Sequence, residues 1–179
     1  LPQHVPGRPV PRIRDGNWHL PDWAPVFLEA LAEGATVKSA AHKAGVNRLS
    51  FGVQDFDAAV QAAVNRVQSE EQIVQLVRAA REARFKSISV DLIYGLPLQT
   101  VASFDVTLAK LIALRPDRVA AYSYAHLPTQ IRAQRMIRPE DMPPPERKLE
   151  LLELTIRRLT EAGYVYIGMD HFALPDDEL

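Results

Sequence analysis

The chain contains no cysteine, and that absence removes several kinds of chemistry at once. Disulfide bonds, a thiol nucleophile and a cysteine-ligated zinc site are all excluded. A conventional iron–sulfur site is excluded as well, because such clusters are held by thiolates. Any reaction that needs a thiolate must take it from outside this sequence.

Strong charge of one sign and long apolar runs are also missing. The formal net charge is −1 over 179 residues, so electrostatics give no reason to expect a nucleic-acid or anionic membrane partner. No apolar run approaches the roughly 20 residues that cross a bilayer, and no signal segment opens the sequence. We therefore expect a soluble cytoplasmic protein. Its first residue, leucine rather than methionine, suggests a piece cut from a longer chain.

Proline gathers at the start of the chain. Residues 1–23 hold five of the fourteen prolines and show no apolar period, so we expect an extended or disordered arm. Residues 24–45 predict a pair of short helices, the second ending at Gly45. Ala41 and Gly45 have the spacing of a helix-turn-helix, which keeps open a DNA-binding or adaptor module. However, the residues after Gly45 favour a strand over a recognition helix.

From residue 46 the pattern alternates between strand and helix. Asp57, Ser69 and Thr100 are well placed to cap the helices, and four strands are predicted, at residues 48–53, 88–94, 119–124 and 164–169. Such alternation predicts an α/β fold in which a parallel sheet, a barrel or part of one, spans residues 46–179. An incomplete barrel would leave open sheet edges, through which the chain could self-associate.

Ligands of α/β barrels bind at the carboxyl ends of the strands, which nominates the polar residues found there. These are Gln54, Asp55, Tyr94, Tyr124, His126, Asp170 and His171. Gln54 suits a sugar or an amino acid, or else a capped turn. Asp170 and His171 look like a pair of metal ligands, but two groups do not make a site, and we predict no metal.

Asp91 is the most informative single residue. Strand alternation places Ser89, Asp91 and Ile93 on one face, which we expect to be the lumen side. A carboxylate among β-branched residues is costly unless it is paired or bound to something. We therefore predict a ligand contact, with a structural ion pair, for example to Arg66, as the alternative. Arg66 itself suits a ligand carboxylate, or else is a surface arginine.

Several runs of the sequence resemble signatures of oxygen-independent coproporphyrinogen III oxidases, which are radical S-adenosylmethionine (SAM) enzymes. The resemblance covers residues 46–179, about three quarters of the chain. The runs that carry it are Gly45–Asp57, Val64–Arg66, Asp91–Pro97, Tyr124–Pro128, Gly163–Ala173 and Pro175–Leu179.

The resemblance implies a partial (βα) barrel that works with a [4Fe–4S] cluster and SAM. In that family the cluster cleaves SAM to a radical, and two propionate side chains of coproporphyrinogen III become vinyl groups, giving protoporphyrinogen IX. By position, Gln54, Arg66, Asp91 and the backbone at Ala125 resemble SAM-contacting residues, in particular those that line a second SAM molecule. The resemblance also implies a porphyrinogen substrate.

The chain departs from the family upstream of residue 46. The CxxxCxxC loop, the glycine-rich SAM loop and an acidic SAM ligand of the first half of the barrel are absent. We therefore expect the chain to be catalytically incompetent alone. The alternatives are a DNA-binding or adaptor module fused to a barrel remnant, and a cluster-less scaffold or haem-binding relative.

Overall fold

The computed structural model describes residues 45–177. The chain divides into two compact units, residues 1–47 and 48–179. The expected arm and nearly all of the expected helix pair lie outside the described residues, so they stay predictions. No helix within residues 45–177 is long and apolar enough to span a bilayer.

The second unit is an α/β fold, as predicted. Its strands are β1 (Arg48–Gln54), β2 (Ser87–Tyr94), β3 (Arg118–Ser123), β4 (Val165–Gly168) and β5 (His171–Ala173). Its α-helices are α3 (Ala58–Ala63), α4 (Glu70–Glu82), α5 (Val101–Leu114) and α6 (Pro145–Glu161), and two 3-10 turns span Arg132–Met136 and Pro139–Asp141.

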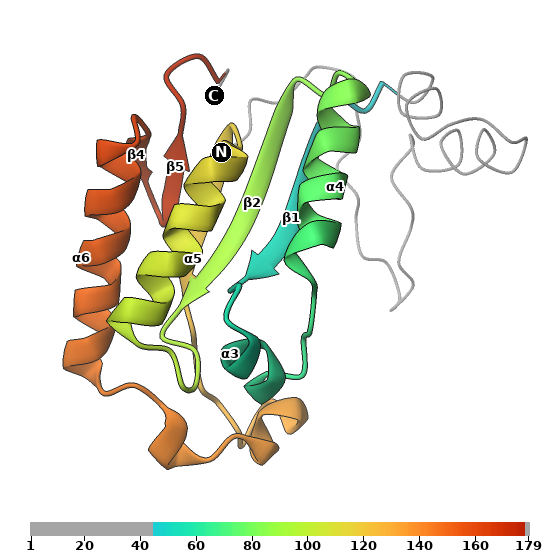
Figure 1. Ribbon diagram of the computed structural model, residues 1–179. Coiled ribbons are helices and arrows are strands. Elements are labelled where there is room, and N and C mark those ends of the chain that lie inside the picture. The colour runs from blue at the N-terminus through green and yellow to red at the C-terminus, as the bar shows by residue number, and fades with distance from the viewer. Residues whose placement is uncertain (1–44, 178–179) are drawn as a thin grey trace, which may run out of the picture. The chain divides into compact units, whose positions relative to one another are not determined.

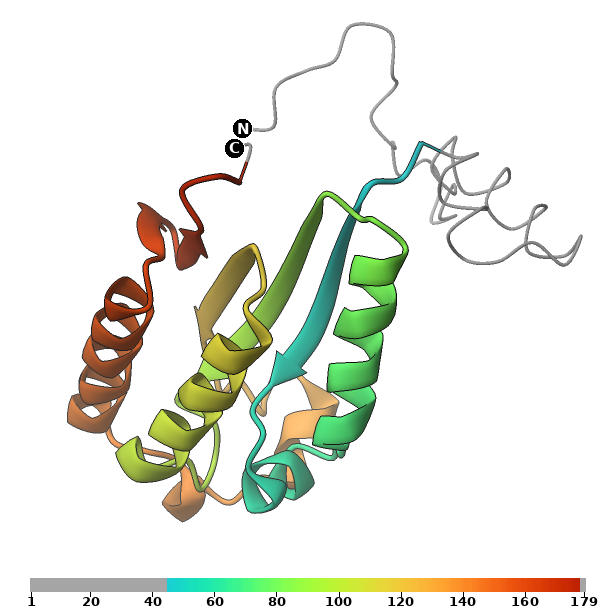
Figure 2. The ribbon, with the colours of Figure 1, turned by 45° about the horizontal axis from the view of Figure 1, so that its top comes forward.

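The described strands form one open sheet in the order β1-β2-β3-β5-β4. β1, β2 and β3 are parallel neighbours, whereas β5 runs antiparallel to both β3 and β4. Figures 1 and 2 show α4, α5 and α6 side by side on one face of this sheet. The short helix α3 and the 3-10 turns lie at the end to which β1 and β2 point (Figure 1). The sheet is therefore part of a barrel wall rather than a closed barrel.

Side-chain hydrogen bonds fix where the helices begin. The Asp57 carboxylate accepts from the N–H groups of the first turn of α3. Ser69 with Gln72 and Thr100 with Ser103 form capping boxes at α4 and α5. These contacts satisfy backbone donors that a helix start otherwise leaves unpaired. All three predicted caps are confirmed.

The two faces of β2 differ as the alternation predicts. Ile88, Val90 and Leu92 are fully buried, and Ser89, Asp91 and Ile93 are half-buried on the opposite face. The buried set belongs to a core that also includes Phe104 and Leu108 of α5 and Leu151 and Leu159 of α6. We call the face that carries Asp91 the lumen face.

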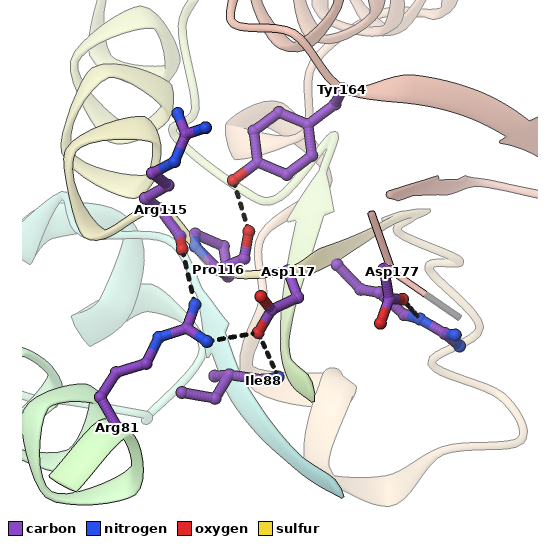
Figure 3. A network of polar contacts seen from close by, with 8 residues as sticks. Arg81, Ile88, Arg115, Pro116, Asp117, Tyr164 and Asp177 are labelled. Atoms are coloured by element: carbon purple, nitrogen blue, oxygen red, sulfur yellow. Dashed lines mark hydrogen bonds and ion pairs between the residues drawn. The ribbon is translucent and has the colours of Figure 1, made fainter. Parts of the chain in front are cut away.

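A polar network ties the amino ends of β2 and β3 together (Figure 3). The Asp117 carboxylate accepts from the Ile88 N–H at 2.7 Å and from the Arg81 guanidinium at 2.8 Å. Arg81 also donates to the Arg115 carbonyl, and the Tyr164 hydroxyl donates to the Pro116 carbonyl at 2.6 Å. The polar groups at this end of the sheet thus already have hydrogen-bond partners within the protein. This indicates that the network holds the fold together and does not bind a ligand.

The last predicted strand was wrong in part. A single strand over 164–169 was expected, but the chain reverses at Met169 and Asp170 and returns as β5. Both residues have positive φ, 49° and 65°, which is the geometry of a two-residue hairpin turn. Gly168 and His171 pair across it. Asp170 therefore lies in a turn, and His171 begins an antiparallel strand instead of ending a parallel one.

The first helix of the barrel is shorter than predicted. The spacing of Val60, Ala63, Val64 and Val67 predicts an apolar helix face that reaches Val67, but α3 ends at Ala63 and Val67 is 76% exposed. Asn65 has a φ of 52°, a left-handed conformation that a helix cannot continue through. Arg66 therefore lies in the segment after the helix, not near its end.

Candidate functional site

The carboxyl ends of β1, β2 and β3 bring together most of the residues that the sequence nominates. Gln54 is the last residue of β1, and Tyr94 is the last residue of β2. Ala125 follows shortly after the end of β3. Because parallel strands end at the same edge of a sheet, these residues share one rim of the molecule.

Gln54 and Arg66 converge on Gly52. The pairing of β1 with β2 is irregular between Gly52 and Gln54, and Gln54 has a φ of 62°. Arg66 Nη2 donates to the Gly52 carbonyl at 2.8 Å. A Cβ placed on Gly52 would lie 2.6 Å from Gln54 Nε2 and 3.0 Å from Arg66 Nη2. The missing side chain of Gly52 is therefore what lets both polar groups lie over the strand.

Gln54 also carries an unused acceptor. Its Oε1 atom is buried and has no hydrogen-bond partner within the described part of the chain. Leaving such an oxygen unpaired costs about 1–3 kcal/mol. A ligand that donates a hydrogen bond to this atom would recover that cost.

Asp91 lies on the lumen face between two small residues. Gly52 of β1 and Ala120 of β3 are its register partners on either side. Its Oδ1 accepts a hydrogen bond of 3.2 Å from the Ser50 hydroxyl. Among the described residues no ion pair joins Asp91 to Arg66, which bonds the Gly52 carbonyl instead. An ion pair of Asp91 with Arg66 is therefore wrong.

Ala125 lies in a segment that two side chains hold in place. Gln134, which is buried, donates to the Ala125 carbonyl at 2.9 Å and accepts from the Leu127 N–H. Lys148 of α6 donates to the Tyr124 carbonyl at 2.7 Å. The backbone at Ala125 is thus fixed from two directions. Sequence reasoning missed Gln134 and Lys148, since a lone glutamine or lysine in a connection or on a helix gives no pattern.

Asp55 is a structural residue rather than a free site residue. Its carboxylate is buried and accepts from the Thr107 hydroxyl at 2.5 Å, the Gln99 amide at 2.5 Å and the Asp57 N–H at 2.8 Å. Gln99 in turn accepts from the Gly95 N–H at 2.6 Å. This network joins the ends of β1 and β2 to α5, and so supports the rim from below.

Neither His126 nor His171 forms a metal centre with the described residues around it. His126 stacks on Tyr124, with ring centroids 6.4 Å apart. His171 contacts the Met169 carbonyl through Nδ1 at 2.5 Å. Within residues 45–177, no group of three His, Cys, Asp or Glu residues is placed to hold a metal ion.

Tyr122 is a further residue of the lumen face that the sequence did not nominate. Its side chain is 41% exposed on the face that also carries Asp91. Burial raises the pKa of Tyr122, and the negative charges of Asp91 and Asp170 raise it further. Its hydroxyl therefore keeps its proton at neutral pH. Alternation along β3 is the signal that could have found it.

Two comparisons of sequence show the same likeness. Residues 39–111 match the family model of the radical SAM superfamily. Oxygen-independent coproporphyrinogen III oxidase of Pseudomonas aeruginosa is 56% identical over 135 residues, which are 75% of this chain and 29% of that protein. The protein of the same description from Thermostichus vulcanus is 54% identical over 137 residues, 76% of this chain and 42% of that protein.

A solved structure agrees with the sequence comparisons. Coproporphyrinogen III oxidase from Escherichia coli, described as a radical SAM enzyme, superposes with a TM-score of 0.76 at 54% identity. The match covers 79% of this chain and 33% of that one, so the chain spans less than half the length of these relatives. Nothing in these comparisons supports the DNA-binding or adaptor alternative. Residues 39–111 are thus similar to the radical SAM superfamily, and about three quarters of the chain is similar to one part of the oxygen-independent coproporphyrinogen III oxidases.

Proposed function

We propose that this chain binds SAM at the carboxyl ends of β1, β2 and β3, as one part of an oxygen-independent coproporphyrinogen III oxidase. The observation that carries the proposal is the convergence of Gln54 and Arg66 on Gly52, beside the Asp91 carboxylate. SAM offers a carboxylate, an ammonium group and ribose hydroxyls. A guanidinium, a carboxylate and an amide acceptor complement these groups.

The residues present fit SAM by their chemistry. Arg66 would hold the carboxylate of the methionine part, since a guanidinium pairs well with a carboxylate. Asp91 would accept hydrogen bonds from the hydroxyl or ammonium groups, and the unpaired Gln54 Oε1 would accept another. The backbone at Ala125 would complete the rim. In the family reaction SAM supplies the adenosyl group that abstracts hydrogen, and these residues would bind and orient it.

The same residues do not fit the [4Fe–4S] cluster. The chain has no cysteine, and the clusters of this family are held by thiolates. We therefore propose that the chain alone does not convert coproporphyrinogen III, and that its contribution to that reaction is binding.

Titration calorimetry of the folded chain with SAM tests the proposal. We expect binding by the wild type and a roughly ten- to hundredfold weaker affinity for Asp91→Asn, because a hydrogen bond to a charged group is worth about 1.5–3 kcal/mol. Asp105→Asn is the matched control, since this partly exposed aspartate pairs with Arg158 of α6, away from the rim.

Circular dichroism must first show that each variant is folded. Equal affinities for the wild type and Asp91→Asn would contradict the proposal. So would an absence of binding by a folded wild type.

A further inference from the structure

One row of residues crosses the lumen face of four strands. Gly52 of β1 pairs with Asp91 of β2, Asp91 with Ala120 of β3, and Ala120 with His171 of β5. Neighbouring strands lie about 4.8 Å apart, so Asp91 and His171 are separated by roughly 10 Å. Ala120 between them is small. Because Ala120 is only 2% exposed, the row places the two polar groups on either side of a covered alanine.

The His171 ring is held in one orientation by the turn that precedes it. Its Nδ1 atom lies 2.5 Å from the Met169 carbonyl oxygen, which only accepts hydrogen bonds. Nδ1 must therefore carry the hydrogen, and Nε2 of the neutral ring is left as an acceptor. The turn itself is anchored to the sheet, because the Ala121 N–H donates to the Asp170 carbonyl at 2.8 Å.

Tyr122 lies next to His171 on the same face. The two rings meet edge to face, with centroids 5.9 Å apart and planes at 86°. Tyr122 follows Ala120 by two positions on β3, so its side chain is directed to the lumen face, where it is 41% exposed. Its neutral hydroxyl is a hydrogen-bond donor on the ring that contacts the His171 ring.

We propose that Tyr122 and His171 form a second subsite on the lumen face that hydrogen-bonds the porphyrinogen. His171 Nε2 accepts from a pyrrole N–H, and the Tyr122 hydroxyl donates to a propionate carboxylate. This inference rests on the proposed function for the identity of the ligand. The chemistry favours it because a porphyrinogen carries both N–H donors and carboxylate acceptors on one ring system, and the two rings in contact here carry one donor and one acceptor.

The geometry of the subsite also separates it from the SAM residues. Asp91, Gln54 and Arg66 gather around Gly52 on β1 and β2, whereas Tyr122 and His171 belong to β3 and β5. The two groups therefore face different parts of a ligand assembly. Substitution at one is expected to leave binding at the other intact.

Binding of coproporphyrinogen III, kept reduced in the absence of oxygen, to the full chain tests the subsite by titration calorimetry. His171→Asn keeps an amide donor where Nδ1 contacts the Met169 carbonyl and removes the group at Nε2. His171→Gln instead places an amide near the Nε2 position. We expect at least fivefold weaker porphyrinogen binding for His171→Asn and for Tyr122→Phe, with binding closer to wild type for His171→Gln.

SAM affinity, measured on the same proteins, separates this inference from the proposed function. We expect none of these substitutions to change it by more than twofold. Equal porphyrinogen affinities in all variants would overturn the subsite, as would a wild type that binds SAM but not the porphyrinogen. Porphyrinogen binding that depends on His171, in a chain that does not bind SAM, would instead support the subsite and count against the proposed function.

Discussion

Gly52 and Asp91 are register partners on adjacent parallel strands, and the missing side chain of Gly52 sets the space beside the Asp91 carboxylate. Because Gln54 and Arg66 extend over Gly52, their side chains and the Asp91 carboxylate lie in one small area of the rim. None of these three groups pairs with another of them. An ion pair between Arg66 and Asp91 would have used up both charges. Instead Arg66 bonds the Gly52 carbonyl and Asp91 accepts from the Ser50 hydroxyl, so neither charge is neutralised by the other.

Gly52→Ala is predicted to disturb binding more than folding. The added Cβ would lie 2.6 Å from Gln54 Nε2 and 3.0 Å from Arg66 Nη2, so both side-chain ends must move. These ends are flexible, and we expect the free energy of unfolding to change by less than about 1 kcal/mol. SAM affinity should fall about tenfold, as measured by calorimetry. Unchanged affinity would show that the two side chains do not need their present positions.

Asp55 and Asp57 allow a matched test of the network under the rim. Asp55→Ala leaves the Thr107, Gln99 and backbone donors unpaired in a buried place, and should lower the free energy of unfolding by about 3 kcal/mol. Asp57→Ala removes a helix cap and should cost about 1 kcal/mol. Urea denaturation measures both. Equal losses would contradict the structural role assigned to Asp55.

Tyr164 is predicted to make stability depend on pH in the alkaline range. Burial raises the pKa of Tyr164 to about 12, from 10.0. The folded state therefore favours the neutral phenol. The contribution of Tyr164 to the stability of the folded state is complete below pH 10 and is lost as the pH rises through about 12. Tyr164→Phe should be less stable at neutral pH by about 1 kcal/mol, since it loses the hydrogen bond to Pro116.

The difference in free energy of unfolding between wild type and Tyr164→Phe should then narrow between pH 10 and about 12. Only the wild type loses stability through this group, because phenylalanine does not titrate. Denaturation curves at several pH values measure it. The other tyrosines titrate in both proteins and cancel from the difference. A gap that stays constant over this range would contradict the raised pKa.

The sequence predicted the parts of the fold that local rules control. The capping roles of Asp57, Ser69 and Thr100 follow from side-chain chemistry near the helix start, and the two faces of β2 follow from strand alternation. The hairpin at Met169 and Asp170 was not foreseen, because neither residue belongs to the Asn-Gly or Asp-Gly pairs that usually mark such turns.

The site was predictable where strand ends alone define it, and less so where distant segments meet. Gln54 and Asp91 follow from the position of each in its strand. That Arg66 would bond the Gly52 carbonyl depends on the early end of α3, which no apolar period revealed. The supports at Gln134 and Lys148 reach the rim from segments far along the chain, and only the tertiary structure shows them.

The central claim is that SAM binds at the rim formed by Gln54, Arg66, Asp91 and Ala125. The most direct test is to record amide chemical shifts of the isotope-labelled chain by NMR during a titration with SAM. The account predicts shift changes concentrated at the ends of β1, β2 and β3, with those four residues among the largest. Changes that are absent, or that fall instead in the arginine-lined groove of about 630 Å³ between α5 and α6, would contradict it.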